Sequence, residues 1–269
     1  MTEFISSREN PLFKELRAIQ ATGSKGQKAR LAFGHALLEG IHLLQTWCAD
    51  PALNVLLTSE LGIEHHEINA LVQQHLDACP DTRVIYLDAN LWSELSELAN
   101  GPQIAGLVSL PSVAPIGTLN GDVVVLDRIQ DAGNVGAILR TAAAAGFTQI
   151  VALSGCAHLW SSKVLRAGMG AHRGLKLYEG WSNQQALSAI TAPLFLATAD
   201  GSVSLFDLDA QLKKSVAWVL GSEGQGVSAE LLAQGNAVSI PMASRVESLN
   251  VATAAAVCLF ETVRVRRLP

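Results

Sequence analysis

Three loops in the C-terminal half of the chain carry residue types that could bind a ligand or transfer a chemical group. Each follows a run of valine, leucine or isoleucine that predicts a buried strand. The loops span residues 127–141 (DRIQDAGNVGAILRT), 221–226 (GSEGQG) and 241–250 (PMASRVESLN). In an open parallel sheet, ligands bind beyond the carboxyl ends of the strands. We therefore expect a ligand site where these loops meet.

The first loop carries an asparagine and an arginine six residues apart. Gly133 and Gly136 permit close approach of another backbone, and Asn134 is expected to cap the helix that follows. Arg140 then lies two turns into a helix that is otherwise rich in alanine. Taken alone, a capped strand–turn–helix unit with a solvent-facing arginine explains this segment.

The second loop places three glycines around one carboxylate. Gly221, Gly224 and Gly226 surround Glu223, so backbone N–H and C=O groups can lie against a flat ligand. The loop lacks the lysine of a phosphate-binding GxxxxGK[ST] motif and does not match GxGxxG. An ordinary nucleotide-phosphate site is therefore not indicated, and an irregular glycine turn is the structural alternative.

The third loop opens the last helix of the chain. Ser244 and Glu247 have the spacing of a capping box, which is a sufficient structural reason for both. Ser248 and Asn250 have no such reason. Because asparagine in the first turns of an apolar helix costs stability, a role for these two side chains at the mouth of the helix is open.

The elements around these loops predict a parallel sheet preceded by a smaller α/β domain. After residue 122, near-continuous apolar strands alternate with helices, including helices at 134–146 and 248–267, which is typical of a parallel sheet covered on both faces. Before residue 110 we expect strands at 54–59, 83–88 and 104–110, helices at 10–20, 37–47, 66–76 and 90–100, and a basic loop at 21–30. The proline- and glycine-bearing segment between them predicts domains at 1–110 and 122–269, with a linker at 111–121.

Composition excludes several classes of protein. The 269 residues are 49% hydrophobic, yet no run of about 18 apolar residues occurs, and the polar N-terminus lacks the apolar run of a signal peptide. We expect a cytoplasmic protein without a membrane partner. The four cysteines are far apart, and adjacent histidines point to different faces of a helix, so no metal site is expected.

Basic residues are concentrated near the N-terminus although the net charge is −5. Lys25, Lys28 and Arg30 in the 21–30 segment could contact the phosphate backbone of a nucleic acid. Basic ends of solvent-exposed helices are the equally good structural alternative.

Taken together and in order, three motifs resemble those of the SpoU (TrmH-like) family of RNA 2'-O-ribose methyltransferases, in the SPOUT superfamily. The motifs are NVGAILRTAAAAG, LGSEGQG and IPMASRVESLNVATAAAVCLFE, and the resemblance extends over essentially all of residues 122–269. The N-terminal segments NPLFKELR and KARLAFGHALLEGIHLL are similar to the small substrate-binding domain of many members. One departure is Asp131-Ala132, where many members have Asp-Pro. Since proline would fix that turn, the loop is expected to be more mobile.

The resemblance implies a fold, a cofactor and an assembly. It implies a parallel α/β sheet with a C-terminal trefoil knot, the SPOUT methyltransferase fold, and a homodimer. S-adenosylmethionine would bind in the knot, held mainly by the main chain. The cofactor-binding residues implied in this chain are Thr198, Ala199, Leu220, Gly221, Glu223, Gly224, Gly226, Ile240, Met242 and Leu249.

The resemblance also implies catalytic roles. Arg140 would lie at the target ribose, Asn134 and Glu223 would support it, and Ser248 and Asn250 would complete the RNA-facing wall. The ribose 2'-oxygen would displace the methyl group in line from the sulfonium. Arg140 would act either as the base or as a stabiliser of the developing alkoxide, and a guanidinium that normally stays protonated leaves both roles open.

The expected substrate is RNA, with ribosomal RNA favoured over transfer RNA by analogy with the family. A second basic cluster could bind RNA phosphate near the site, although a solvated helix face is nearly as good an explanation. It is formed by Lys163, Arg166, Arg173 and Lys176, with His158 and His172. Two other classes of protein remain. A non-catalytic RNA-binding protein would not need the complete set of site residues, and a nucleotide-dependent metabolic enzyme would need a phosphate fingerprint that this sequence lacks.

Overall fold

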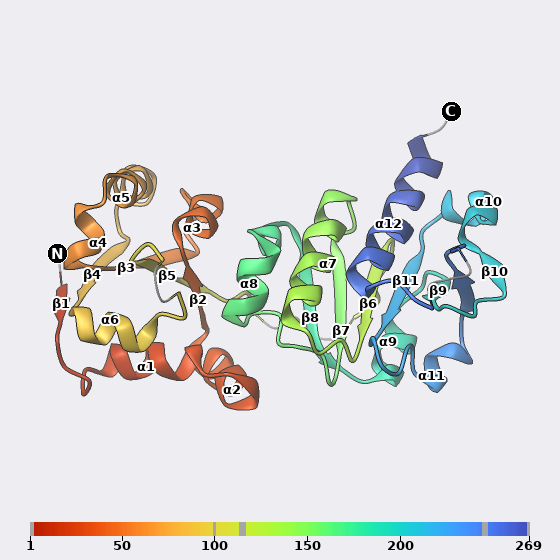
Figure 1. The fold of residues 1–269 in the computed structure, drawn as a ribbon, viewed down its shortest axis with the longest axis horizontal. Coiled ribbons are helices and arrows are strands. Elements are labelled where there is room, and N and C mark those ends of the chain that lie inside the picture. The colour runs from red at the N-terminus through yellow and green to blue at the C-terminus, as the bar shows by residue number, and fades with distance from the viewer. Residues whose placement is uncertain (1–2, 99–100, 113–116, 244–246, 268–269) are drawn as a thin grey trace. The chain divides into compact units, whose positions relative to one another are not determined.

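The computed structural model describes residues 3–98, 101–112, 117–243 and 247–267 (Figure 1). Contacts between Cα atoms divide the chain into two compact units. The first unit contains residues Met1–Ser112 and Trp160–Gly170, and the second contains Val113–Leu159 and Ala171–Pro269. Part of the predicted linker, residues 113–116, lies outside the described residues. No helix in the described ranges is long and apolar enough to cross a membrane.

The first unit is a five-stranded mixed sheet with helices on both faces. The strand order is β1 (Glu3–Ile5), β4 (Arg83–Leu87), β3 (Leu53–Ser59), β5 (Ile104–Ser109) and β2 (His35–Glu39), in which β5 runs antiparallel to both of its neighbours. One face carries α1 (Pro11–Gln20), α2 (Gly23–Phe33) and α6 (Ala89–Leu95). The other carries α3 (Ile41–Trp47), α4 (Glu60–Glu64) and α5 (His66–Ala78).

Helix α1 illustrates how the sequence dictates these elements. The Asn10 side chain accepts hydrogen bonds from the backbone N–H groups of Leu12 and Phe13 at 2.9 and 3.3 Å, and Pro11 fits the first helical position. Phe13, Leu16 and Ile19 then recur at helical spacing and are buried, so this helix was predicted correctly.

Two predictions in this unit were wrong. Residues 23–30 of the predicted loop instead form most of helix α2, which Gly34 ends with a left-handed φ of 71°. The predicted helix at 37–47 is split, because Leu37 and Leu38 pair with β5 in strand β2 and Gly40, with a φ of 98°, turns the chain into α3. Leucine on both faces of a buried strand gives the same apolar run as a helix, which is why the sequence pattern failed here.

Helix α8 (Ser162–Gly168) belongs to the first unit by its contacts. Leu165 is fully buried in the core of that unit, and the Ser162 hydroxyl donates to Gln20 Oε1 at 2.7 Å. The Arg166 guanidinium bonds to the carboxylates of Glu39 and Glu97 at 3.1 and 2.7 Å. The domain boundaries at residues 110 and 122 remain a prediction. By contacts, residues 160–170 belong to the first unit although they follow residue 122 in the chain.

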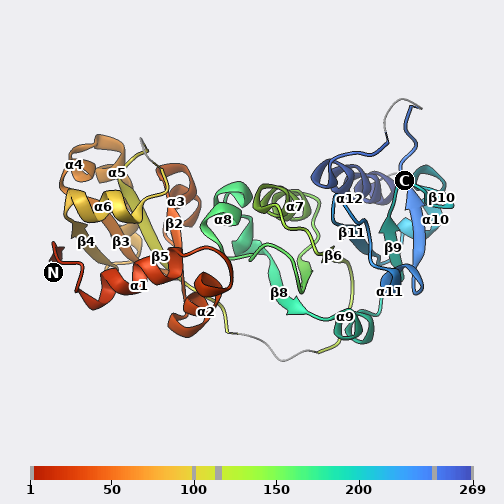
Figure 2. The same cartoon turned by 60° about the horizontal axis from the view of Figure 1, so that its bottom comes forward.

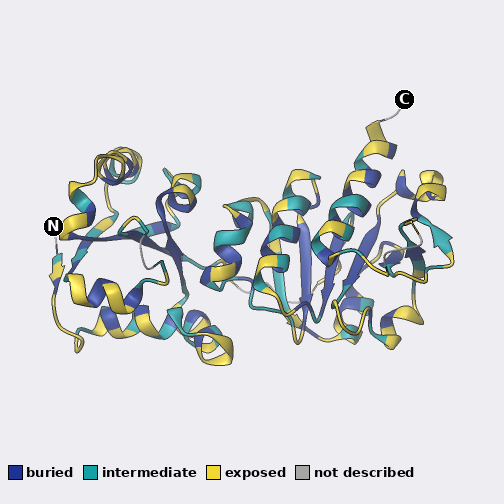
Figure 3. Ribbon diagram, viewed as in Figure 1, coloured by how far each residue is buried: buried dark blue, intermediate teal, exposed yellow. Residues whose placement is uncertain are grey.

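The second unit contains the predicted parallel sheet, which has seven strands. The strand order is β10 (Val203–Ser204), β12 (Asn236–Ser239), β9 (Leu194–Ala197), β11 (Ala217–Gly221), β6 (Val123–Asp127), β7 (Gln149–Leu153) and β8 (Lys176–Trp181). Strands β6 and β7 are buried along their whole length, which explains their unbroken apolar sequences (Figure 3).

Helices cover both faces of this sheet. Helices α7 (Ala132–Ala144) and α12 (Val251–Arg267) pack side by side on one face, and α9 (Asn183–Ala189) and α11 (Ala229–Leu232) lie on the other (Figure 2). Short helical turns occupy Ala171–Gly174 (η1), Leu205–Asp207 (η2) and Asp209–Leu212 (α10). The buried Trp218 indole donates to the Thr262 hydroxyl at 3.0 Å, which ties β11 to α12. The loops that follow β6, β11 and β12 therefore start from fixed positions.

Candidate active site

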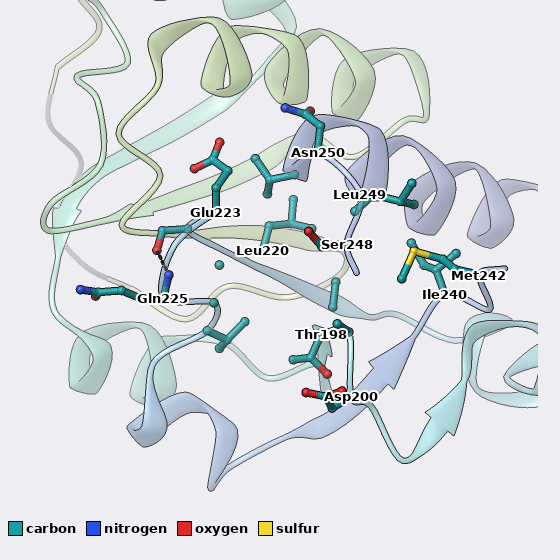
Figure 4. Close-up of a pocket in the computed structure, with 18 of the residues that line it drawn as sticks. Thr198, Asp200, Leu220, Glu223, Gln225, Ile240, Met242, Ser248, Leu249 and Asn250 are labelled. Atoms are coloured by element: carbon teal, nitrogen blue, oxygen red, sulfur yellow. Dashed lines mark hydrogen bonds between the residues drawn. The ribbon is translucent and has the colours of Figure 1, made fainter. Parts of the chain in front are cut away.

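A cavity of about 460 Å³ lies at the carboxyl ends of β9, β11 and β12 (Figure 4). Its walls come from the three segments that follow those strands, with additions from α11 and α12. The lining residues are 197–200, 220–223, 225–227, Leu232, Ile240, Met242, 248–251 and Ala254. A cavity of this size suits a small-molecule ligand, and it lies at the sheet edge that the sequence pattern predicted.

The glycine loop after β11 folds back tightly on its own strand. A Cβ atom at Gly221 would lie 2.2 Å from the carbonyl carbon of Gly226, so only glycine fits this position. Gly226 has a left-handed φ of 64°, and its N–H donates to the Ser222 carbonyl at 2.8 Å. The backbone N–H of Gln225 donates to the Ser222 hydroxyl at 3.3 Å, shown as a dashed line in Figure 4. The backbone itself therefore forms one wall of the cavity.

A chain of side-chain hydrogen bonds joins the three predicted loops. The Asn134 Nδ2 group donates to Glu223 Oε1, and the Asn250 Nδ2 group donates to Asn134 Oδ1 at 3.0 Å. Glu223 and Asn250 line the cavity, whereas Asn134 links them from α7. The sequence pattern named all three residues, and the tertiary structure brings them together.

The helix caps differ from the predicted ones. Helix α7 begins at Ala132, and the Asp131 carboxylate caps it by accepting from the Asn134 N–H at 2.7 Å, so the prediction of Asn134 as the cap was wrong. Helix α12 begins at Val251, where Asn250 Oδ1 accepts from the N–H groups of Ala252 and Thr253 at 2.9 and 3.3 Å. Asn250 therefore has a structural role as a helix cap, which was not predicted from the sequence. The predicted capping box with Ser244 lies outside the described residues.

The other two predicted catalytic residues, Ser248 and Arg140, are exposed, as Glu223 and Asn250 are. Ser248 lines the cavity. Arg140 does not line it, and no described residue makes a hydrogen bond or ion pair with its side chain. Arg140 lies about 9 Å along α7 from Asn134, since each helical residue advances the chain by about 1.5 Å. Its role as the group at the ribose remains a prediction.

Most residues predicted to hold the cofactor line the cavity. Those that do are Thr198, Ala199, Leu220, Gly221, Glu223, Gly226, Ile240, Met242 and Leu249, whereas Gly224 is absent from its wall. The lining residues that the sequence did not indicate are Ala197, Asp200, Val227, Leu232, Val251 and Ala254. Asp200 carried a usable signal, because it follows strand β9 closely, but Leu232 is brought to the cavity only by the packing of α11.

The charges of the cavity wall fit S-adenosylmethionine. Asp200 and Glu223 contribute two carboxylates, and the lining contains no lysine, arginine or histidine among the described residues. Carboxylates suit a ligand that carries a sulfonium and an ammonium group and disfavour phosphates. Leu220, Ile240 and Leu249 supply apolar surface for an aromatic base, and the glycine loop supplies backbone hydrogen-bonding groups.

The residues predicted to contact RNA separate into two groups. Arg30 is buried, with 3% exposed, and its Nη1 donates to the Ile19 carbonyl at 2.6 Å, so burial removes it from the RNA-facing set. Arg166 is held by two carboxylates of the first unit. The exposed members are Lys25, Lys28, Lys163 and Arg173, of which Arg173 alone belongs to the second unit. No cluster of three metal-ligating side chains occurs in the parts of the chain that the structure describes.

Comparison with known proteins identifies the family. The model of the SpoU rRNA Methylase family matches residues 122–260. The chain belongs to this family. An uncharacterized tRNA/rRNA methyltransferase of Synechocystis sp. is 34% identical, and the match covers 97% of this chain and 93% of that protein. The 23S rRNA (guanosine(2553)-2'-O)-methyltransferase RlmP of Bacillus subtilis is 26% identical, covering 95% and 97% of the two chains.

Solved structures of RNA methyltransferases share the fold along nearly the whole chain. A structure described as an RNA 2'-O ribose methyltransferase is 25% identical, with a TM-score of 0.76 and coverage of 98% of this chain and 100% of that one. The AdoMet-bound rRNA methyltransferase of Sinorhizobium meliloti is 24% identical, with a TM-score of 0.76 and coverage of 98% of each chain. The predicted family and α/β fold with a parallel sheet are therefore confirmed.

Proposed function

We propose that this protein transfers a methyl group from S-adenosylmethionine to a ribose 2'-hydroxyl of ribosomal RNA. The observation that carries the proposal is the hydrogen-bonded chain of Glu223, Asn134 and Asn250, which joins the three family motifs at the wall of a carboxylate-lined cavity. Ribosomal RNA is favoured over transfer RNA because the Bacillus subtilis relative, which matches nearly the whole chain, is named for a 23S rRNA nucleotide.

The residues of this chain have distinct tasks in the proposed reaction. When bound, S-adenosylmethionine supplies an electrophilic methyl group on a sulfonium leaving group. The glycine loop and the residues after β12 bind and orient the cofactor, which accounts for much of the rate because the reaction needs in-line geometry. Arg140 stabilises the negative charge that develops on the ribose 2'-oxygen as its proton passes to a neighbouring RNA phosphate or to solvent. Glu223 fixes Asn134 and with it the first turn of α7, the helix that presents Arg140.

Titration with candidate cofactors tests this proposal directly. Calorimetry with S-adenosylmethionine, S-adenosylhomocysteine, NAD and ATP should give binding to the first two alone, because a carboxylate-lined cavity repels phosphates. Mapping of 2'-O-methyl sites in ribosomal and transfer RNA from cells with and without the gene then identifies the substrate. Unchanged methylation of every RNA in the deletion strain would remove the substrate assignment.

We also propose that the first unit contributes RNA binding through Lys25 and Lys28 of α2. Both side chains are exposed and lie on one short helix, so they could neutralise neighbouring phosphates. Lys25→Glu with Lys28→Glu should raise KM for RNA and weaken its salt dependence, whereas Lys213→Glu, an exposed control after α10, should change neither. An unaltered KM in the double variant would contradict this role.

The family further leads us to propose a C-terminal knot and a homodimer. Support for a knot comes from the close contact between Gly201, after β9, and Val238 in β12. A Cβ at Gly201 would lie 2.3 Å from the carbonyl carbon of Val238, so only glycine fits there. When the chain is pulled from its two ends in a single-molecule experiment, its contour length should be shorter than that of an unknotted chain of 269 residues. The difference would equal the length of the residues held in the tightened knot. The dimer is proposed from the family resemblance alone. Sedimentation equilibrium should return twice the chain mass of 28.4 kDa.

A further inference from the structure

Arg128, in the second unit, contacts the glycine loop that follows β11 but does not line the cavity. Its Nε and Nη2 groups donate to the two carboxylate oxygens of Asp127 at 2.8 and 3.4 Å. Its Nη1 donates to Gln225 Oε1 at 2.6 Å, and Nη2 also donates to the Gly226 carbonyl at 3.2 Å. Gln225 and Gly226 line the cavity, and Arg128 does not. The guanidinium therefore holds two residues of the cavity wall in place from outside the cavity.

Asp127 completes this attachment at the end of the loop. Its side chain is 1% exposed, and Oδ2 accepts from the backbone N–H of Ser228 at 2.6 Å. The hydrogen bond to Asp127 in turn raises the pKa of Arg128. Together the two side chains attach the middle and the end of the loop to strand β6, which neighbours β11 in the sheet.

The backbone at Arg128 adopts a conformation that is unfavourable for its residue type. Its φ is 57°, in the left-handed region, and only Ala49 and Met169 share a positive φ among the non-glycine residues that the structure describes. Gly155 leaves room for the side chain, because a Cβ there would lie 3.3 Å from Arg128 Cγ. Glycine would satisfy this backbone better, so the arginine at this position needs a side-chain reason.

We propose that Arg128 is a positioning residue that holds the glycine loop in its cofactor-binding conformation. The inference rests on the proposed function, because it assigns the cavity to S-adenosylmethionine. Without the guanidinium, the loop would sample other conformations, and the apparent affinity for the cofactor would fall by the fraction of molecules in the correct one. Affinity for RNA and the rate at saturating cofactor would not depend on this fraction.

Two variants separate the side chain from the backbone. Arg128→Gly keeps the left-handed φ and removes the guanidinium, whereas Arg128→Lys keeps the charge and loses the planar fork. We expect both to raise Kd and KM for S-adenosylmethionine by about tenfold, the scale of one or two charge-assisted hydrogen bonds. The rate at saturating cofactor and KM for RNA should stay within about twofold. Hydrogen exchange of the amides at 222–228 should become faster.

A matched control is Arg83→Lys, which alters an exposed arginine–carboxylate pair with Glu3 in the first unit and should change none of these values. Unchanged cofactor affinity and unchanged exchange in both Arg128 variants would overturn the inference and leave the proposed function intact. A parallel rise in KM for RNA, with a lowered melting temperature, would also overturn it by revealing general destabilisation. Failure of the unaltered protein to bind S-adenosylmethionine would instead overturn the proposed function, and the inference with it.

Discussion

The cofactor cavity and the α7 surface that carries Arg140 lie in the same unit but are built differently. The cavity is lined in part by backbone, and glycines, a helix cap and an ion pair with a buried carboxylate fix its loops in place. Arg140 is exposed, and no described residue holds its side chain. Under the proposed function, cofactor recognition would depend on the shape of the folded chain, whereas methyl transfer would depend on a side chain that meets its partner only when RNA binds.

Replacement of Arg140 should separate these two functions most strongly. Arg140→Ala and Arg140→Lys should lower kcat by about 10³-fold, the scale of losing a preorganised group that stabilises developing charge. The Kd for S-adenosylmethionine should change less than about twofold, since Arg140 does not line the cavity. Single-turnover methylation and calorimetry measure the two quantities. Near-normal turnover in either variant would remove Arg140 from the mechanism.

Replacement of Gly221 should have the opposite effect. A new Cβ in Gly221→Ala would lie 2.2 Å from the backbone of Gly226, so the loop must move and cofactor binding should weaken by about 100-fold, with a loss of roughly 1–3 kcal/mol in the free energy of unfolding. Gly224 offers a control in the same loop, because no atom lies within 4 Å of a Cβ built there. If Gly224→Ala weakened binding as much as Gly221→Ala, the steric explanation would be wrong.

Asn250 connects the two regions, and its two roles can be separated. Asn250→Ala and Asn250→Ser both remove the donor to Asn134, and each should lower kcat by about tenfold if the chain of hydrogen bonds supports catalysis. Serine still caps α12, so it should retain about 1 kcal/mol of stability that alanine loses. Urea denaturation and steady-state kinetics test the two expectations. Equal stability of the variants would show that the cap contributes nothing.

A final effect, on stability and not on activity, concerns the packing beneath α7, where His172 lies in the turn η1. Burial lowers the pKa of His172 to about 4, and its Nε2 donates to the Leu159 carbonyl at 2.9 Å. As the pH falls, the His172 side chain is protonated near pH 6.5 in the unfolded chain but only near pH 4 in the folded chain. Stability should therefore be fully present above pH 6.5 and fall by about 2 kcal/mol at pH 5. Urea titrations of His172→Gln should show a shallower loss, whereas exposed His66→Gln should match the unaltered protein.

The amino-acid sequence by itself determined the parallel sheet of the second unit and the three loops of the site. Buried parallel strands need unbroken apolar runs, and loops at their carboxyl ends need glycine, caps and polar groups, so both leave local marks. Glu223, Asn134 and Asn250 were identified in this way. Helix α2 and strand β2 were not, because an apolar run or a glycine-bearing basic segment fits several local structures and tertiary packing decides between them.

Only the tertiary structure decided which side chains do structural work. Arg30 and Arg166 have the sequence character of RNA-binding residues, yet one is buried and the other is held by two carboxylates. Asn250 was read as a functional residue alone, and it also caps α12. Arg128 attracted no attention in the sequence, since its partners Gln225 and Gly226 lie almost a hundred residues away and meet it only because β11 pairs with β6. Spacing along the chain records local geometry, whereas contacts between distant loops depend on the order of strands in the sheet.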